Sequence, residues 1–182
     1  SGTIPIEAAM IGRNIAPGLN RKFASQEWDI IPPEIWKEER KAAFEAIDYD
    51  ADIRIEASDI SGRAVEAAIE NAAEAGVDDC VEFKKMDMAR LTAEEEGGII
   101  ITNPPYGERI GEKKQIEAIY SAYNEFYRKN PTWSLFMVTT DKEVENKIFG
   151  RPADRRRKLY NGRLEVCYYQ FHGQKPGRKQ EK

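Results

Sequence analysis

The chain contains little cysteine and histidine and no long apolar run, and each scarcity excludes a class of protein. Its two cysteines, Cys80 and Cys167, are too few and too isolated for a disulfide framework, and we expect both to be buried. With a single histidine they cannot assemble a zinc site, so no metal is expected. No stretch approaches the roughly 18 apolar residues of a membrane span, which predicts no membrane partner. Cysteines without a framework suit a reducing compartment, and we expect a cytoplasmic protein.

Charge is distributed unevenly along the 182 residues, whose formal net charge is −4. Residues 151–182 hold ten lysines and arginines against three acidic residues, a local charge of +7, so the first 150 residues carry −11. A basic end on an acidic body is compatible with binding to a nucleic acid, and it is equally typical of a solvated tail.

Strand and helix patterns alternate along the chain. The spacing of apolar residues predicts helices at 4–11, after Pro32-Pro33, at 61–75 and at 113–129, and strands at 52–57, 81–86, 97–102 and 135–139. Near the end, Asn161-Gly162 separates segments 157–160 and 164–171, which predicts a hairpin. This order favours an α/β fold: a parallel sheet covered by helices, with an antiparallel hairpin at its end.

Three polar residues follow expected strands closely. Asp59, Asp87 and Asn103 each come just after a strand pattern ends. Because ligands of parallel sheets bind beyond the carboxyl ends of the strands, we expect these side chains to converge on one edge of the sheet.

The segment Asn103-Pro104-Pro105-Tyr106 carries the sharpest chemical signal. An exocyclic amino group on a base is a poor nucleophile, because its lone pair is delocalised into the ring. An Asn side-chain oxygen and a backbone carbonyl in a rigid Pro-Pro turn can accept its hydrogens and hold the nitrogen toward a methyl donor. Tyr106 offers a flat face on which a base can stack. The alternative is a simple turn that ends a strand.

Asp59 and Asp87 form a second candidate group. An acid at the end of a strand and before a helix can bind ribose hydroxyls, and a second acid can accept from an adenine amino group. Ile60 and Met88, which follow the two acids, are placed to flank an adenine ring. The alternative for Asp59 is a favourable interaction with the dipole of the helix that follows.

The opening residues Ser1-Gly2-Thr3 allow two interpretations. They could be the remnant of a tag. They could also end a glycine-rich turn that leads into a helix, where backbone amides meet an anionic group.

Five strings together resemble a known family: SGTIPIEAAMIGRNIAPGLNRKF, WDIIP, ASDIS, NPPYGER and KLYNGRLEV. They are similar to the methyltransferase domain of the bacterial large-subunit ribosomal RNA guanine-N2 methyltransferases, many of which are labelled as N6-adenine-specific DNA methylases. The resemblance covers residues 1–172, which we expect to form one methyltransferase domain, followed by a polar tail at 173–182.

The resemblance implies a class I, Rossmann-like methyltransferase fold with a mostly parallel seven-stranded sheet and an antiparallel C-terminal hairpin. It implies S-adenosyl-L-methionine as cofactor and guanine N2 in ribosomal RNA as the methylated group. Carried over by residue, Gly2 and Thr3 end the cofactor loop, and Asp59 binds the ribose. Asp87 binds the adenine, and Asn103, Pro104, Pro105 and Tyr106 form the site of the target amine.

One family feature does not occur in the sequence. A strand ending in Asp-Pro-x-Cys-Gly normally precedes Ser-Gly-Thr, and an RNA-binding THUMP domain lies further upstream. We therefore expect the domain to be truncated at its start. The strands that end at Asp59 and at Asn103 should then be separated by a strand-wide gap, or the sheet should be rearranged to close it.

Two other functions remain open from the sequence. The Asn-Pro-Pro-Tyr segment also occurs in enzymes that methylate adenine N6, so an adenine-N6 methyltransferase acting on DNA or RNA is the first alternative. A non-catalytic RNA-binding or assembly factor that retains the fold is the second.

Overall fold

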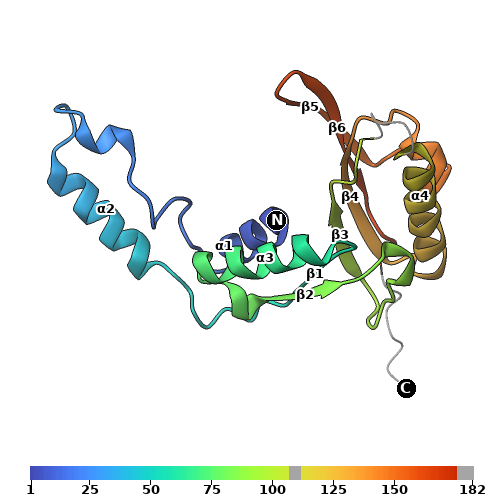
Figure 1. The fold of residues 1–182 in the computed structure, drawn as a ribbon, viewed down its shortest axis with the longest axis horizontal. Coiled ribbons are helices and arrows are strands. Elements are labelled where there is room, and N and C mark those ends of the chain that lie inside the picture. Colours follow the sequence, from blue (N-terminus) through green and yellow to red (C-terminus); the bar gives the residue numbers. More distant parts are fainter. Residues whose placement is uncertain (107–111, 176–182) are drawn as a thin grey trace. The chain divides into compact units, whose positions relative to one another are not determined.

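The computed structural model describes residues 1–106 and 112–175 (Figure 1). They fall into two compact units, Ser1–Lys85 and Met86–Lys182. The expected single domain at 1–172 therefore contains two units, and the expected tail at 173–182 lies outside the described residues from residue 176 onward. Among the helices described, none has the length and apolar character to cross a membrane.

The first unit combines three α-helices with a two-stranded parallel sheet. The helices are α1 (Thr3–Gly12), α2 (Pro33–Glu45) and α3 (Gly62–Ala75), and the strands are β1 (Ile55–Asp59) and β2 (Val81–Lys85). The strands pair in register from Ile55 opposite Val81 to Asp59 opposite Lys85. All five elements were expected from the sequence, and the structure confirms them within a few residues.

Helix α3 begins and ends where its capping residues predict. The Ser61 side chain accepts a hydrogen bond from the backbone N–H of Ala64, and Gly76 ends the helix at φ 72°. A left-handed residue at this position is favourable for glycine because glycine has no Cβ to clash with the preceding turn.

The core of the first unit lies between α1, α3 and the sheet. Its buried residues are small or branched apolar side chains and one thiol, namely Ile6, Ala9, Ala72, Val77, Cys80 and Val81. Burial of Cys80 agrees with the sequence, whereas Cys167 is only half-buried. Helix α2 buries none of its residues, although the helical spacing of Trp36, Ala43, Phe44 and Ile47 predicts one apolar stripe. Trp36 stacks on Phe23 with ring centroids 5.8 Å apart.

The second unit is a four-stranded mixed sheet covered on one face by α4 (Glu112–Lys129). Its strands are β3 (Gly98–Thr102), β4 (Trp133–Thr139), β5 (Arg155–Asn161) and β6 (Leu164–Phe171), in the order β3-β4-β6-β5. Strands β3 and β4 are parallel, and the other two pairs are antiparallel. The expected parallel strands and C-terminal hairpin are confirmed.

The α4 side of this sheet contains the larger core. Leu135 and Met137 of β4 and Phe171 of β6 are at most 1% exposed there. They pack against the aromatic face of α4, which consists of Tyr120, Tyr123, Phe126 and Tyr127 together with Ile116. This apolar face was readable from the sequence because its residues recur at helical spacing.

Two local predictions in this unit were wrong in detail. The hairpin turn comprises Gly162 and Arg163, since Asn161 pairs with Leu164. Gly162 has φ 62°, and this supplies the positive φ that a two-residue hairpin turn requires. The sequence Thr140-Asp141-Lys142-Glu143 fits a capping box for a short helix, but the π-helical turn at Glu145–Phe149 has no side-chain cap. Asp141 instead accepts a hydrogen bond from the N–H of Glu143.

The six strands described belong to two separate sheets, β1-β2 and β3-β4-β6-β5. No ladder between described residues joins β1 to β3. The expected gap between these strands concerns both units together, and it stays a prediction.

Candidate functional site

The Asn103–Tyr106 segment follows directly after β3 in the second unit. Strand β3 ends beside β4, with Thr102 opposite Met137 in the parallel register. The carboxyl ends of the two strands therefore lie at the same edge of the sheet. Pro104 is buried there, Tyr106 is half-buried, and Asn103 and Pro105 are exposed. An exposed Asn103 beside a buried Pro104 leaves the amide accessible while the turn beneath it is anchored.

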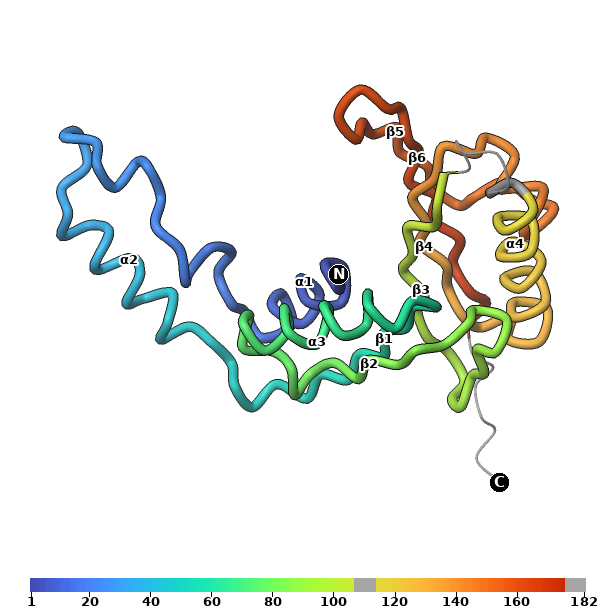
Figure 2. The backbone as a smooth tube through the Cα atoms, viewed as in Figure 1, coloured from blue at the N-terminus to red at the C-terminus, as the bar shows by residue number. Residues whose placement is uncertain are grey.

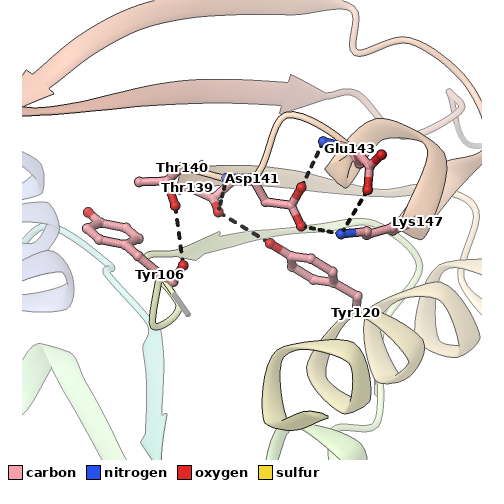
Figure 3. Close-up of polar contacts among 7 residues, drawn as sticks. All are labelled: Tyr106, Tyr120, Thr139, Thr140, Asp141, Glu143 and Lys147. Carbon is pink, nitrogen blue, oxygen red and sulfur yellow. Dashed lines mark hydrogen bonds and ion pairs between the residues drawn. The ribbon is translucent and has the colours of Figure 1, made fainter. Parts of the chain in front are cut away.

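The end of this segment is tied to the end of β4. The Thr140 hydroxyl donates a hydrogen bond to the backbone carbonyl of Tyr106 at 3.3 Å (Figure 3). The Tyr106 ring points away from Tyr120 and Lys147 in this view. One hydroxyl, directly after the end of the neighbouring strand β4, therefore holds the backbone from which the Tyr106 ring projects.

A polar network that runs from a buried hydrogen bond to the surface supports the same edge from the α4 side. The Tyr120 hydroxyl lies 3.3 Å from the Thr139 hydroxyl, which accepts from the N–H of Asp141 at 3.1 Å. The Asp141 carboxylate in turn accepts from Lys147 Nζ at 2.6 Å (Figure 3). This hydrogen bond raises the pKa of Lys147, and burial raises the pKa of Tyr120. Lys147 therefore stays protonated and Tyr120 neutral at physiological pH.

A second tyrosine fixes the last residue of β3. The Tyr123 hydroxyl donates to the Thr102 hydroxyl oxygen at 3.0 Å, and burial raises the pKa of Tyr123. Thr102 immediately precedes Asn103, so α4 restrains the backbone from which the Asn103 side chain projects.

In the first unit, Gly2 is the N-cap of α1, with φ 76°. A Cβ built at Gly2 would lie 2.8 Å from the Cβ of Ala68 in α3, closer than real Cβ atoms approach. Glycine is therefore required here both by its backbone conformation and by the close contact between the two helices. Thr3, the first helical residue, is exposed.

Helix α1 runs antiparallel to β1, which brings its start to the carboxyl end of the sheet. At the other end of α1, a Cβ at Gly12 would contact Ile53, just before β1, and Arg13 binds Asp79, just before β2. The first-turn amides of α1 therefore lie toward the end of the unit that carries Asp59. These amides have no partner within the helix, which makes them available to a polar ligand.

Asp59 is the last residue of β1 and is exposed. Its carboxylate accepts from the N–H of Ser61 at 2.8 Å, and further lone pairs of the carboxylate can accept from a ligand. Ile60 is 60% exposed, so its apolar surface is open to a flat partner. Asp59 lies two residues before Ser61, the N-cap of α3, so this position is compatible both with a ribose site and with the helix-dipole alternative.

Asp87 and Met88 belong to the second unit, beyond the end of β2 at Lys85. Asp87 is exposed and accepts from the N–H of Ala89 at 3.0 Å, as the cap of a 3-10 turn at Met88–Arg90. Met88 is partly buried against the core under α4, so part of its side chain is already used in packing.

The structure thus gathers the expected residues into two groups, one in each unit. Gly2, Thr3, Asp59 and Ile60 lie in the first unit, and Asp87, Met88 and Asn103 to Tyr106 lie in the second. Their convergence on a single edge stays a prediction. Among the described residues, no group of His, Cys, Asp and Glu side chains could hold a metal ion.

Sequence reasoning missed the residues that support the site. Thr140, Thr102 and Tyr123 each contact or restrain the Asn103–Tyr106 segment. Thr102 and Thr140 carried a weak signal, since each is a threonine at the carboxyl end of a strand. Tyr123 was expected only as part of an apolar stripe.

Comparisons with known proteins identify the family of the chain. The family described as RMKL-like, methyltransferase domain (UPF0020) matches residues 1–170. "Putative RNA methyltransferase YpsC" of Bacillus subtilis is 45% identical over 180 residues, which are 98% of this chain and 46% of that protein. "Ribosomal RNA large subunit methyltransferase K/L" of Shewanella baltica is 36% identical over 179 residues, which are 94% of this chain and 25% of that protein.

Two solved structures are similar over nearly the whole chain. SMU.472, named a putative methyltransferase and crystallised with SAH, is 45% identical with a TM-score of 0.89, covering 96% of this chain and 46% of that one. A protein of Listeria monocytogenes named as a predicted N6-adenine-specific DNA methylase is 39% identical with a TM-score of 0.86, covering 95% and 44%.

The chain spans less than half the length of these relatives. Their shared fold is the class I methyltransferase fold expected from the sequence, and S-adenosylmethionine is the methyl donor of the family. With a family match over residues 1–170, the chain belongs to the RMKL-like methyltransferase domain family.

Proposed function

We propose that this chain is the catalytic domain of an enzyme that methylates the exocyclic amino group of a base in RNA, namely guanine N2 in large-subunit ribosomal RNA. The observation that carries the proposal is the Asn103–Tyr106 turn at the carboxyl ends of two parallel strands, fixed through Thr140 and Thr102. Two relatives are named as an RNA methyltransferase and a ribosomal RNA methyltransferase, and these names support RNA as the substrate.

In this proposal the turn holds the target nitrogen. The side-chain oxygen of Asn103 and the backbone carbonyl of Pro104 accept the two amino hydrogens, which favours sp³ character at nitrogen. The nitrogen lone pair forms the new N–C bond, and the C–S bond breaks with its electron pair passing to sulfur. The methylated nitrogen then loses one proton to water, so the products are the N-methyl base, S-adenosylhomocysteine and H⁺.

The first unit offers groups that fit the cofactor. S-adenosylmethionine supplies an electrophilic methyl group on a sulfonium sulfur when it is bound. The open amides at the start of α1 suit its carboxylate. The Asp59 carboxylate suits the ribose hydroxyls, with the exposed face of Ile60 beside the adenine. Asp87 would accept from the adenine amino group.

The proposal also concerns the regions of the full-length protein outside this chain. Relatives are more than twice as long as this chain. We propose that the full-length protein likewise includes an RNA-binding THUMP domain and a further strand of the sheet.

Methyl transfer onto defined RNA tests the function. The full-length protein is incubated with tritiated S-adenosylmethionine and large-subunit ribosomal RNA transcribed without modifications, and the nucleosides are then separated. Tritium in N2-methylguanosine is the expected result. Tritium in N6-methyladenosine would support the first alternative, which the name of the Listeria relative favours.

Methylated product and S-adenosylmethionine binding distinguish an enzyme from a non-catalytic assembly factor. An assembly factor that retains only the fold would bind the RNA and yield no methylated nucleoside. Calorimetric titration with S-adenosylmethionine gives an independent measurement, and the exposed Asp59 leads us to expect binding.

A further inference from the structure

The hairpin of β5 and β6 carries a concentration of positive charge outside the candidate site. Every residue of β5 is exposed, and β5 is the edge strand of its sheet. Between residues 151 and 163 the chain has six arginines and lysines and one acid, Asp154. Figure 2 shows the turn of this hairpin extending beyond the ends of β3 and β4.

The register of the hairpin sorts these cations onto two faces of the sheet. Arg156 lies opposite Tyr169 and Lys158 opposite Cys167, residues that pack on the α4 side. Because side chains alternate along a strand, Arg155 and Arg157 point to the other face. Two pairs of cations on one strand thus have different surroundings.

The cations on the α4 side already have acidic partners. Arg156 forms an ion pair with Glu145 at 3.5 Å, and Lys158 pairs with Glu165 at 2.6 Å. The hydrogen bond to Glu165 raises the pKa of Lys158. These acids neutralise the charge that this face presents to solvent.

The opposite face keeps its charge. Among the residues that the structure describes, neither Arg155 nor Arg157 lies within ion-pair distance of an acid. The two residues are about 6.6 Å apart along the strand, a spacing comparable with that of neighbouring phosphates on a nucleic-acid strand. The exposed Arg163 in the turn adds a third cation at the hairpin tip.

We propose that the face of β5 formed by Arg155 and Arg157 binds the phosphate backbone of the RNA substrate, outside the catalytic edge. This inference rests on the proposed RNA methyltransferase function. Guanidinium groups bind phosphate oxygens with two parallel hydrogen bonds, so arginines at this spacing suit a repeating anion. No acid of β5 interrupts the face, since the strand contains none. Contacts of this kind position RNA and do not select its sequence.

The salt dependence of RNA binding tests the proposal. The full-length protein and its Arg155→Gln/Arg157→Gln variant are titrated with unmodified large-subunit ribosomal RNA at several KCl concentrations. Loss of two phosphate contacts should reduce the slope of log K against log[KCl] by about 1.4–1.8. Between about 50 and 200 mM KCl, the wild type should then lose about 7- to 12-fold more affinity than the variant.

The opposite face of the same strand provides the matched control. The Arg156→Gln/Lys158→Gln variant removes the same charge from paired positions, and its slope should stay close to the wild-type value. An Arg155→Lys/Arg157→Lys variant should keep the wild-type slope. Equal slopes for the two Gln variants, or an unchanged slope in the first, would overturn the inference.

Failure of the hairpin proposal can be distinguished from failure of the proposed methyltransferase function. If wild-type protein methylates RNA and the Arg155→Gln/Arg157→Gln variant binds RNA with an unchanged slope, only the hairpin inference fails. If wild-type protein yields no methylated nucleoside, the proposed function fails. Unchanged thermal unfolding and S-adenosylmethionine affinity in each variant show that the fold is intact.

Discussion

The hydroxyl of Thr140 and the carbonyl oxygen of Tyr106 are 3.3 Å apart and joined by a hydrogen bond, although 34 residues separate them. This contact ties the end of the candidate target site to the end of the neighbouring parallel strand. It leaves the Tyr106 ring directed away from the polar network around Tyr120 (Figure 3).

Replacing Thr140 by valine should slow methyl transfer without changing cofactor binding. One hydrogen bond of about 0.5–1.5 kcal/mol corresponds to a roughly 2- to 13-fold lower kcat. Thr140→Ser keeps the hydroxyl and should restore the rate, and this separates a positioning role from a packing role. Single-turnover kinetics on the RNA transcript measure the effect, and a Ser variant as slow as the Val variant would contradict it.

Asn103→Ala should lower turnover by roughly two to three orders of magnitude, the scale for losing one preorganised polar contact to a transition state. The affinity for S-adenosylmethionine should change little, because Asn103 faces the target amine in the proposed site. Tritium transfer measures the first quantity and calorimetry the second. A variant with the turnover of the wild type would contradict the proposed mechanism.

Tyr106→Ala should weaken RNA binding by about 1–3 kcal/mol, the contribution of one lost base stack. Tyr106→Phe is the control, since it keeps the ring and the backbone carbonyl that Thr140 binds. Fluorescence anisotropy with labelled RNA gives both affinities. A Phe variant that binds as weakly as the Ala variant would show that stacking is not the role of this ring.

Asp59→Asn should weaken S-adenosylmethionine binding about 10- to 150-fold, because hydrogen bonds to a charged acceptor contribute about 1.5–3 kcal/mol. Asp52→Asn is the matched control, an exposed acid before the opposite end of β1. Calorimetry on both variants compares them. Equal affinities would mean that Asp59 serves only the start of α3.

The free energy of unfolding should fall at alkaline pH because of two buried tyrosines in the core between α4 and the sheet. Burial raises the pKa of Tyr127, whose hydroxyl donates to the carbonyl of Ser134 at 2.9 Å, and raises that of Tyr169 to about 12. In the unfolded chain the pKa of a tyrosine is about 10, and below that pH each buried tyrosine makes its full contribution to stability. This contribution is lost as the pH rises toward the higher pKa of the folded state.

A Tyr127→Phe variant tests this dependence. It should cost about 0.5–1.5 kcal/mol at pH 7 through the lost hydrogen bond, and then lose less stability than the wild type above about pH 10. Urea unfolding at several pH values measures both quantities. Parallel curves for the two proteins would show that Tyr127 does not titrate on unfolding.

The positions of most elements were predictable from the sequence, because helical and strand periods and caps depend on residues within a few positions of one another. Ser61 and Gly76 bound α3 as expected, and the apolar stripe of α4 forms the larger core. The Asn103–Tyr106 turn was likewise readable, since it follows an apolar strand directly.

The contacts that support the Asn103–Tyr106 segment could be identified only from the tertiary structure. Thr140 reaches Tyr106 because β3 and β4 are neighbours, a pairing that no local pattern encodes. The division of the hairpin cations also depends on register, because a shift by one residue would exchange the faces of Arg155 and Arg156. Local sequence specifies what each segment can become, whereas the pairing of distant segments specifies which side chains meet.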